Sequence, residues 1–191
     1  MLLTREDIRR LVLGVGPLLP RPVHILVVGG AAVLALCPEG SATRDIDAMR
    51  TEDIDVFLDA VRKWSSGEGS RRIDVNTRSD AFEVYFPEDW RERISVVDDL
   101  STPMVQVLVP SPEDLAIAKV FRFGAKDADD IALLAALPGF DRQRFREGFL
   151  NVLPVAIGNK RWHAQSFAMA WNRLWPDSPV DAEDFLRTAT G

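Results

Sequence analysis

Residues 23–49 read VHILVVGGAAVLALCPEGSATRDIDAM, and the order of residue types in this stretch decides the fold. Its first six residues form an apolar run rich in branched side chains, which predicts a strand buried on both faces. Gly29 and Gly30 follow this run, and the small apolar residues of 30–37 predict a helix packed closely on the sheet. A loop then leads into a second strand, predicted over 43–49. The stretch therefore predicts a strand, a glycine turn, a helix and a further strand in succession.

The second of these strands carries two carboxylates, Asp45 and Asp47. Side chains alternate along a strand, so we expect both carboxylates on the same side. Two ionised carboxylates so close repel each other unless a proton or a cation lies between them. Mg²⁺ prefers carboxylate oxygens together with phosphate oxygens, and Gly29 and Gly30 would let backbone N–H groups approach phosphates at a helix N-terminus. We therefore expect a site for Mg²⁺ and a nucleoside triphosphate here.

Each half of this pattern also has a simpler interpretation. A glycine pair after a strand is typical of a tight strand-to-helix turn, and Asp-Ile-Asp is typical of a solvated strand end. Fourteen residues (31–44) separate Gly30 from Asp45. The order and spacing of the two halves favour a joint nucleotide site over two unrelated features.

The composition indicates an ordinary globular protein with an acidic balance. The 191 residues carry a net charge of -6, and 47% of them are hydrophobic. This charge argues against a positively charged coat for bulk nucleic-acid binding, although a local basic groove remains compatible with it. Cys37 is the single cysteine, the first ten residues lack the apolar core of a signal peptide, and no apolar run reaches about 18 residues. We expect a cytoplasmic protein that makes no membrane contact.

The order of the predicted elements divides the chain into two parts. Residues 1–110 are expected to form an α/β core, whose further strands are predicted over 73–75, 82–86, 94–97 and 104–109. The sequence Ser-Pro-Glu-Asp at 111–114 is a typical helix start. Helices are then predicted over 112–122, 127–137, 141–152, 160–174 and 180–188. The predicted fold class is α/β (α+β), a small mixed sheet followed by a helical region, 111–191, packed on the core.

The segment VVGGAAVLAL followed by TRDIDAM resembles the glycine-pair and DxD signature of the DNA polymerase β-like nucleotidyltransferase superfamily. It is especially similar to the branch that contains AbiEii-type toxins and minimal nucleotidyltransferases. The stretches SPEDLAIAK at 111–119 and KDADDI at 126–131 also resemble that branch, in which an EDL…K helix precedes an R/K-D-x-x-D helix. The resemblance covers roughly residues 23–137. It implies a nucleotidyltransferase fold, with Mg²⁺-dependent transfer of a nucleoside monophosphate from a nucleoside triphosphate to an RNA (tRNA among the candidates) or protein hydroxyl, in a toxin–antitoxin setting.

The resemblance also implies roles for individual residues. It assigns nucleotide binding to Gly29, Gly30, Thr43 and Arg44, and both catalysis and metal binding to Asp45 and Asp47. Lys119 would approach the phosphates or the attacking group, and Asp127 or Asp130 would orient it. Without the resemblance, a lysine at position 119 is typical of a surface residue with a buried stem.

Active members of the superfamily usually have a third carboxylate on a neighbouring strand. The strand that we expect in this place, 104–109, offers only Gln106, a neutral amide that holds a metal poorly. Asp74 and Asp98 are the two possible substitutes, and the sequence does not choose between them. Two hypotheses follow: a Mg²⁺-dependent nucleotidyltransferase, and a catalytically inactive protein of the same fold that acts by binding, as an antitoxin or a regulatory partner.

The helix predicted over 160–174 mixes basic and aromatic residues. Such a surface can stack bases and contact phosphates. However, one helical face collects Trp162, Phe167, Trp171 and Leu174. We therefore favour a helix that packs in a core or against a partner over a nucleic-acid surface.

Overall fold

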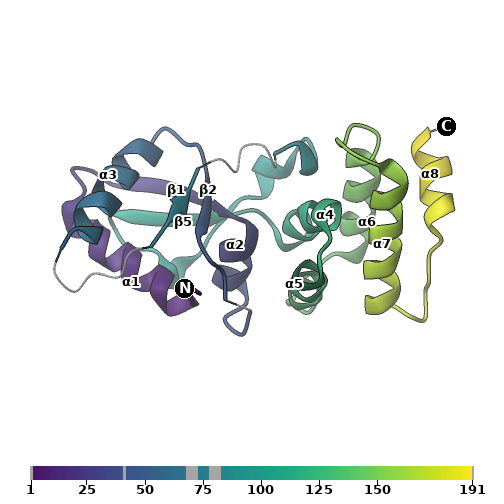
Figure 1. The fold of residues 1–191 in the computed structure, drawn as a ribbon, viewed down its shortest axis with the longest axis horizontal. Coiled ribbons are helices and arrows are strands. Elements are labelled where there is room, and N and C mark those ends of the chain that lie inside the picture. The colour runs from purple at the N-terminus through teal and green to yellow at the C-terminus, as the bar shows by residue number, and fades with distance from the viewer. Residues whose placement is uncertain (1, 41, 68–72, 78–82, 191) are drawn as a thin grey trace. The chain divides into compact units, whose positions relative to one another are not determined.

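A computed structural model describes residues 2–40, 42–67, 73–77 and 83–190 of the chain (Figure 1). The chain divides into two compact units, one formed by residues 1–81 and 93–110, the other by residues 82–92 and 111–191. In the described part of the chain, the first unit contains a mixed sheet of five strands, and the second is built from helices. The predicted α/β class with a helical C-terminal region is confirmed.

The first unit contains helices α1 (Arg5–Val15), α2 (Gly29–Leu36) and α3 (Ile54–Ser65), and strands β1 (Val23–Val28), β2 (Ile46–Met49), β3 (Val75–Asn76), β4 (Ser95–Val96) and β5 (Val105–Val109). The strand order in the sheet is β3-β2-β1-β5-β4. β1 is antiparallel to β2 and parallel to β5, while β3 runs parallel to β2 and β4 runs antiparallel to β5. The apolar run at 23–28 thus forms the central strand, as its sequence predicts.

The two faces of this sheet differ in burial. One face is formed by the buried residues Ile25, Val27, Ile46, Ala48, Val105 and Val107. On the other face, His24 and Gln106 are exposed, and Asp47 and Asn76 are half-buried. α2 and α3 both contact β1, and α1 contacts both of these helices. The polar residues of the sheet therefore gather on its more exposed face.

The prediction of a strand over 82–86 is wrong for the residues that the structure describes. Residues 83–85 form a 3-10 turn, while Phe82 lies outside the described residues. Tyr85 stacks on Phe121 with ring centroids 5.1 Å apart, and Phe86 stacks on Trp90 at 4.7 Å. These aromatic side chains pack within the second unit, so their alternation with polar residues does not reflect pairing in a sheet.

The second unit contains helices α4 (Pro112–Arg122), α5 (Ala125–Ala135), α6 (Arg142–Val152), α7 (Lys160–Leu174) and α8 (Ala182–Thr190). α4 begins as predicted, because the hydroxyl of Ser111 accepts the N–H of Asp114 at 3.2 Å. α4 contacts α5, α6 and α7, and α8 contacts α6 and α7. The core between them is largely aromatic: the rings of Phe149 and Phe167 lie 4.3 Å apart, and Phe185 meets Phe167 at 4.8 Å.

The interpretation of α7 as a core helix is confirmed for two of its aromatic residues. Phe167 is completely buried and Trp171 is 4% exposed, whereas Trp162 at the start of the helix is 48% exposed. The indole N–H of Trp171 donates to the carbonyl of Ser178 at 2.7 Å. Trp171 is therefore held in place by packing and by a hydrogen bond, and it is not available for base stacking.

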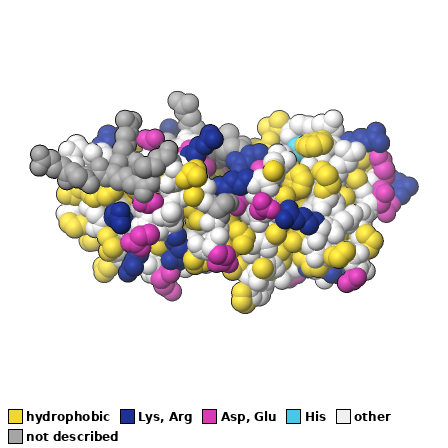
Figure 2. Space-filling view, turned by 60° about the horizontal axis from the view of Figure 1, so that its bottom comes forward, with side chains coloured by type: hydrophobic (Ala, Val, Ile, Leu, Met, Phe, Trp, Pro, Cys, Tyr) yellow, Lys and Arg dark blue, Asp and Glu magenta, His cyan; other side chains and the backbone are white. Residues whose placement is uncertain are grey.

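On the face that Figure 2 presents, both Lys and Arg side chains and Asp and Glu side chains are exposed. Within the described ranges, no helix combines the length and the apolar character that crossing a bilayer requires.

The contact between α1 and α3 gives a first testable prediction. A Cβ added at Gly14 would overlap Nε1 of the Trp64 indole. We expect Gly14→Ala to lower the free energy of unfolding by about 1–3 kcal/mol, because the rigid indole must move. In a Trp64→Ala background, the same substitution should raise this free energy by up to about 1 kcal/mol, since alanine is the better helix former. Urea denaturation of the four proteins measures the cycle, and purely additive effects would contradict this packing.

Candidate functional site

Gly29 lies directly against the carboxylate of Asp47. The antiparallel ladder between β1 and β2 pairs Val28 with Asp47, so the carboxylate lies beside the point where β1 ends and α2 begins. Gly29 has a φ of 64°, a left-handed conformation that glycine adopts readily. A Cβ at this position would lie 2.7 Å from Oδ2 of Asp47. Glycine is therefore required at position 29 both by the backbone conformation and by the close approach of the carboxylate.

The start of α2 presents backbone N–H groups at the same point. The first N–H groups of a helix have no partner within the helix and carry a partial positive charge. Val28 at the N-cap position provides no side-chain hydrogen bond to them. Residues 30–35 are buried, which fixes the helix firmly in the unit. Gly29 and Gly30 thus occupy a helix start that suits a phosphate group.

Asn76 is the polar group next to Asp47 on the neighbouring strand. The parallel ladder between β2 and β3 places Asp47 opposite Asn76. Nδ2 of Asn76 donates to Oδ1 of Asp47 at 2.9 Å. The carboxylate is therefore oriented by an amide on one side, and its other oxygen lies toward Gly29.

The expectation that residues 104–109 supply the group beside the two carboxylates is wrong, because β1 lies between β2 and β5. Gln106 pairs with His24 at the beginning of β1, whereas Gly29 follows the end of this strand. Asp98 follows β4, which is three strands away from β2; at about 4.8 Å per strand spacing, this is roughly 14 Å.

Of the two possible substitutes, only Asp74 lies beside β2. Its carbonyl oxygen accepts the N–H of Ile46 at 2.9 Å, and its side chain is exposed. Asp74 is thus the carboxylate nearest to the DxD motif along the neighbouring chain segment, while the position opposite Asp47 itself belongs to Asn76.

The residues just before β2 are placed differently from the prediction. β2 begins at Ile46, so the expected strand over 43–49 is shorter at its start. Thr43 is buried and forms an isolated bridge with Leu3, which ties the N-terminal segment to this region. Arg44 is exposed, and Asp45 lies half-buried in a bend immediately before the strand. The roles of these residues in nucleotide binding stay predictions.

The acidic residues at this site fit one particular mode of metal binding. Among the described residues, no group of three or more His, Cys, Asp and Glu side chains is placed to share a metal ion. Mg²⁺ is commonly held by one or two carboxylates together with substrate phosphates and water. The carboxylate of Asp47 lies beside the start of α2, where phosphates would bind, and Asp45 is two residues away in the chain. This donor set suits Mg²⁺ that arrives with a nucleotide.

A second group of charges lies within the helical unit. Lys119 on α4 is only 4% exposed, so the simple interpretation as a surface lysine is wrong. Its Nζ lies 3.2 Å from Oδ1 of Asp127 and 2.6 Å from Oδ2 of Asp130, both on α5. Arg122 also donates to Asp127, at 2.6 and 3.1 Å. Both aspartates that the sequence left open therefore contact Lys119.

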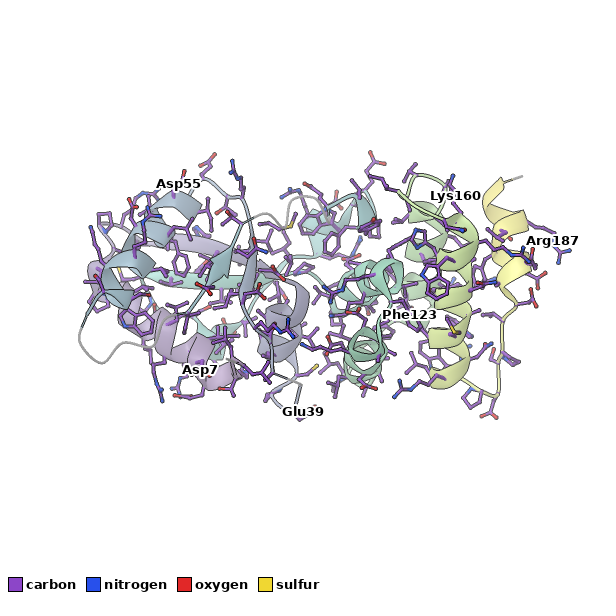
Figure 3. The ribbon with its side chains drawn as sticks, in the orientation of Figure 1. Asp7, Glu39, Asp55, Phe123, Lys160 and Arg187 are labelled. Atoms are coloured by element: carbon purple, nitrogen blue, oxygen red, sulfur yellow. The ribbon has the colours of Figure 1, made fainter. Side chains whose placement is uncertain are left out.

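This network connects α4 to the start of α5. Phe123, labelled in Figure 3, ends α4 with a φ of 31°, and the N–H of Gly124 donates to Oδ2 of Asp127 at 3.0 Å. Burial raises the pKa of Asp127, but hydrogen bonds from Arg122 and Gly124 and the charge of Lys119 outweigh it and lower this pKa to about 2. The network thus stabilises the α4–α5 pair, and the catalytic role expected for Lys119 and Asp127 stays a prediction.

Asn76 is the site residue that the sequence analysis missed. The signal was present, because Ile73-Asp74-Val75-Asn76 alternates apolar and polar residues, and the predicted strand stopped one residue too early at 75. A strand of two residues is too short for periodicity to locate its end. The pairing with β2 could not be read from the chain.

Comparison with known proteins identifies one family. The family described as a nucleotidyltransferase of unknown function (DUF6036) matches residues 16–174 of the chain. The matched range includes the glycine pair, both carboxylates of the DxD motif, Asn76 and Lys119. The comparisons with curated proteins and with solved structures find no match.

The contact between Gly29 and Asp47 gives a prediction with a matched control. Gly139 also has a left-handed φ, 85°, but a Cβ there would meet nothing within 4 Å. We expect Gly139→Ala to cost about 1–2 kcal/mol of unfolding free energy from backbone strain alone. Gly29→Ala should cost more, because the carboxylate of Asp47 must also move away from Asn76. Chemical denaturation compares the two variants. Equal losses of unfolding free energy would show that the contact with Asp47 does not contribute to the requirement for glycine at position 29.

The lowered pKa of Asp127 predicts a loss of stability in acid. Since this pKa falls from 3.8 to about 2 on folding, the ionised carboxylate contributes about 2 kcal/mol at neutral pH. This contribution is fully present above a pH of about 4 and is lost as the pH falls through about 2. Asp127→Asn should therefore lower the unfolding free energy at pH 7 and flatten its decline between these two pH values. The control is Asp129→Asn, at an exposed position in the same helix; if both variants show the wild-type decline, the account of Asp127 is wrong.

Proposed function

Because the chain belongs to the DUF6036 family of nucleotidyltransferases of unknown function, we propose that it transfers a nucleoside monophosphate from a nucleoside triphosphate to a hydroxyl group of RNA, tRNA among the candidates, or of a protein. One observation carries the proposal: the carboxylate of Asp47 lies against Gly29, at the start of a helix. A carboxylate that can bind a cation and a helix start that can bind phosphate are thus adjacent, an arrangement that suits a metal-bound triphosphate.

The backbone at Gly29 and Gly30 would bind the triphosphate. Their N–H groups belong to the first turn of α2, whose partial positive charge favours phosphate oxygens. The absence of side chains at both positions allows phosphates to approach the backbone closely. Arg44 is exposed just before β2 and would provide a positive charge for the same ligand. These groups account for binding and orientation of the nucleotide.

Asp45 and Asp47 would hold Mg²⁺ together with the phosphates. When bound, Mg²⁺ would neutralise charge that develops on the phosphate oxygens during transfer. Asp47 is held by the hydrogen bond from Asn76 and by the backbone at Gly29. A carboxylate fixed in this way loses little conformational freedom when a ligand binds, which favours a well-defined geometry.

The proposed reaction is a single displacement at the α-phosphate. The oxygen of the acceptor hydroxyl forms a bond to the α-phosphorus, and the bond from this phosphorus to the bridging oxygen of the β-phosphate breaks. Pyrophosphate leaves with the electron pair of that bond, and the proton of the hydroxyl passes to solvent. By resemblance to the AbiEii-type branch, we propose a toxin–antitoxin setting in the cytoplasm for this activity.

A second candidate is a protein of the same fold that binds nucleotide without turnover and acts as an antitoxin or a regulatory partner. The specific observation in its favour is Asn76, a neutral amide on the strand next to the DxD motif, because active members of the superfamily that the sequence resembles usually carry a third carboxylate on a neighbouring strand. An amide contributes no negative charge toward a bound cation. This candidate keeps the nucleotide site but predicts that no acceptor is labelled.

The transfer assay uses α-phosphate-labelled nucleoside triphosphates, each incubated separately with Mg²⁺ and either total RNA or a nuclease-treated lysate. We expect one of the two acceptor pools to be labelled by the wild type. Asp47→Asn should reduce labelling by on the order of 10²-fold or more. Mutation of a residue that only hydrogen-bonds to a metal ligand typically lowers metal affinity or activity about 10–100-fold, and mutation of the ligand itself should lower activity at least as much.

The matched control is Asp55→Asn, an exposed carboxylate on α3 that is labelled in Figure 3. This variant should transfer the same amount of label to the acceptor as the wild type does. Equal labelling by wild type and Asp47→Asn would refute the proposed site. Nucleotide binding with no labelling of RNA or protein would support the second candidate.

A further inference from the structure

The position opposite Asp47 on the neighbouring strand holds an amide, where a carboxylate would be needed to share a second cation. We propose that Asn76 is a positioning residue for Asp47, and that its amide limits this site to a single divalent cation. The proposal rests on the proposed function, because it concerns the cation that Asp45 and Asp47 would hold. It goes further in assigning a role to Asn76 and a stoichiometry to the site.

The geometry fixes both oxygens of the Asp47 carboxylate. Oδ1 accepts the N–H of Asn76 at 2.9 Å. Oδ2 lies so close to Gly29 that a Cβ there would be 2.7 Å away. Rotation of the carboxylate would lengthen the hydrogen bond from Asn76, so this bond favours the observed orientation. An ionised carboxylate only accepts hydrogen bonds, which means that the amide group of Asn76 must face it with nitrogen and not with oxygen.

This orientation of the amide acts against a second cation. Two metal ions in a shared site lie about 3.5–4 Å apart and are bridged by carboxylate oxygens. The N–H of Asn76 takes a lone pair of Oδ1 and turns its partial positive charge toward the space beside this oxygen. Asp45 and Asp47 together carry two negative charges, which balance one divalent cation.

The acidic residues that the structure describes around this site do not supply the missing ligand. Asp98 is three strands away from β2. Asp74 is exposed before β3, and within the described ranges it does not join Asp45 and Asp47 in a group of three placed to share a metal ion. A third carboxylate at position 76 would change this, because it would lie directly opposite Asp47.

The test is a titration with Mn²⁺ alone, followed by the electron paramagnetic resonance signal of the free ion. The number of Mn²⁺ ions at this site is the number bound per chain by the wild type minus the number bound per chain by Asp47→Asn. We expect one Mn²⁺ per chain at this site in the wild type, and severalfold weaker binding with unchanged stoichiometry in Asn76→Ala. Asn76→Asp should bind Mn²⁺ on the order of tenfold tighter, because ligand charge strongly affects cation affinity.

The matched control is Asn151→Asp, which introduces the same change at an exposed position of α6. It should bind Mn²⁺ as the wild type does. Thermal unfolding adds a readout that does not depend on activity: in EDTA, Asn76→Asp should melt at a lower temperature than Asn151→Asp, because its carboxylate repels Asp47, and Mn²⁺ should remove this difference.

Two outcomes overturn the inference while the proposed function stands: two Mn²⁺ ions at the site in the wild type, or an Asn76→Asp variant that binds Mn²⁺ no more tightly than Asn151→Asp. If Asp47→Asn binds as much Mn²⁺ as the wild type, the cation site of the proposed function fails together with the inference. Labelling of an acceptor in the transfer assay is scored separately, so the two failures can be told apart.

Discussion

A carboxylate and a helix start meet at the end of β1, and the proposed site depends on their contact. Asp47 lies so close to Gly29 that no side chain fits at position 29, and the left-handed backbone there also favours glycine. The β1–β2 ladder brings Asp47 to this point, and the β2–β3 ladder adds Asn76 on its other side. Three strands and one helix thus define the position of a single carboxylate.

In the helical unit, buried charged side chains are paired with one another. Lys119 and two aspartates are removed from water together, and burial of unpaired charges would be strongly unfavourable. Lys119 is paired with both aspartates. Hydrogen bonds from Arg122 and Gly124 and the charge of Lys119 lower the pKa of Asp127, so its carboxylate stays ionised. In the first unit, by contrast, Asp47 is half-buried and faces a helix start and a neutral amide. One acidic group is neutralised within the protein, and the other lies where we propose that a metal-bound nucleotide binds.

The sequence predicts those parts of the molecule that depend on local pattern. The apolar run at 23–28, the glycine turn and the helix start at Ser111 are all confirmed, since hydrophobic periodicity and capping are properties of neighbouring residues. The strand predicted over 82–86 fails because its aromatic residues pack on helices, which periodicity does not report. The place expected for the strand 104–109, beside the two carboxylates, is wrong for a related reason: strand order is set by long-range pairing, and only the fold shows that β3 lies next to β2.

The central claim is that a triphosphate binds where Gly29 and Asp47 meet. The most direct measurement is a titration of ¹⁵N-labelled protein with Mg²⁺ and a non-hydrolysable nucleoside triphosphate, followed by amide chemical shifts. The account predicts that the amides of Gly29 and Gly30 shift most, while those of Gly139 and Gly158 in the helical unit, which also have positive φ, stay unchanged. Saturable binding that leaves the amide chemical shifts of Gly29 and Gly30 unchanged would contradict the account.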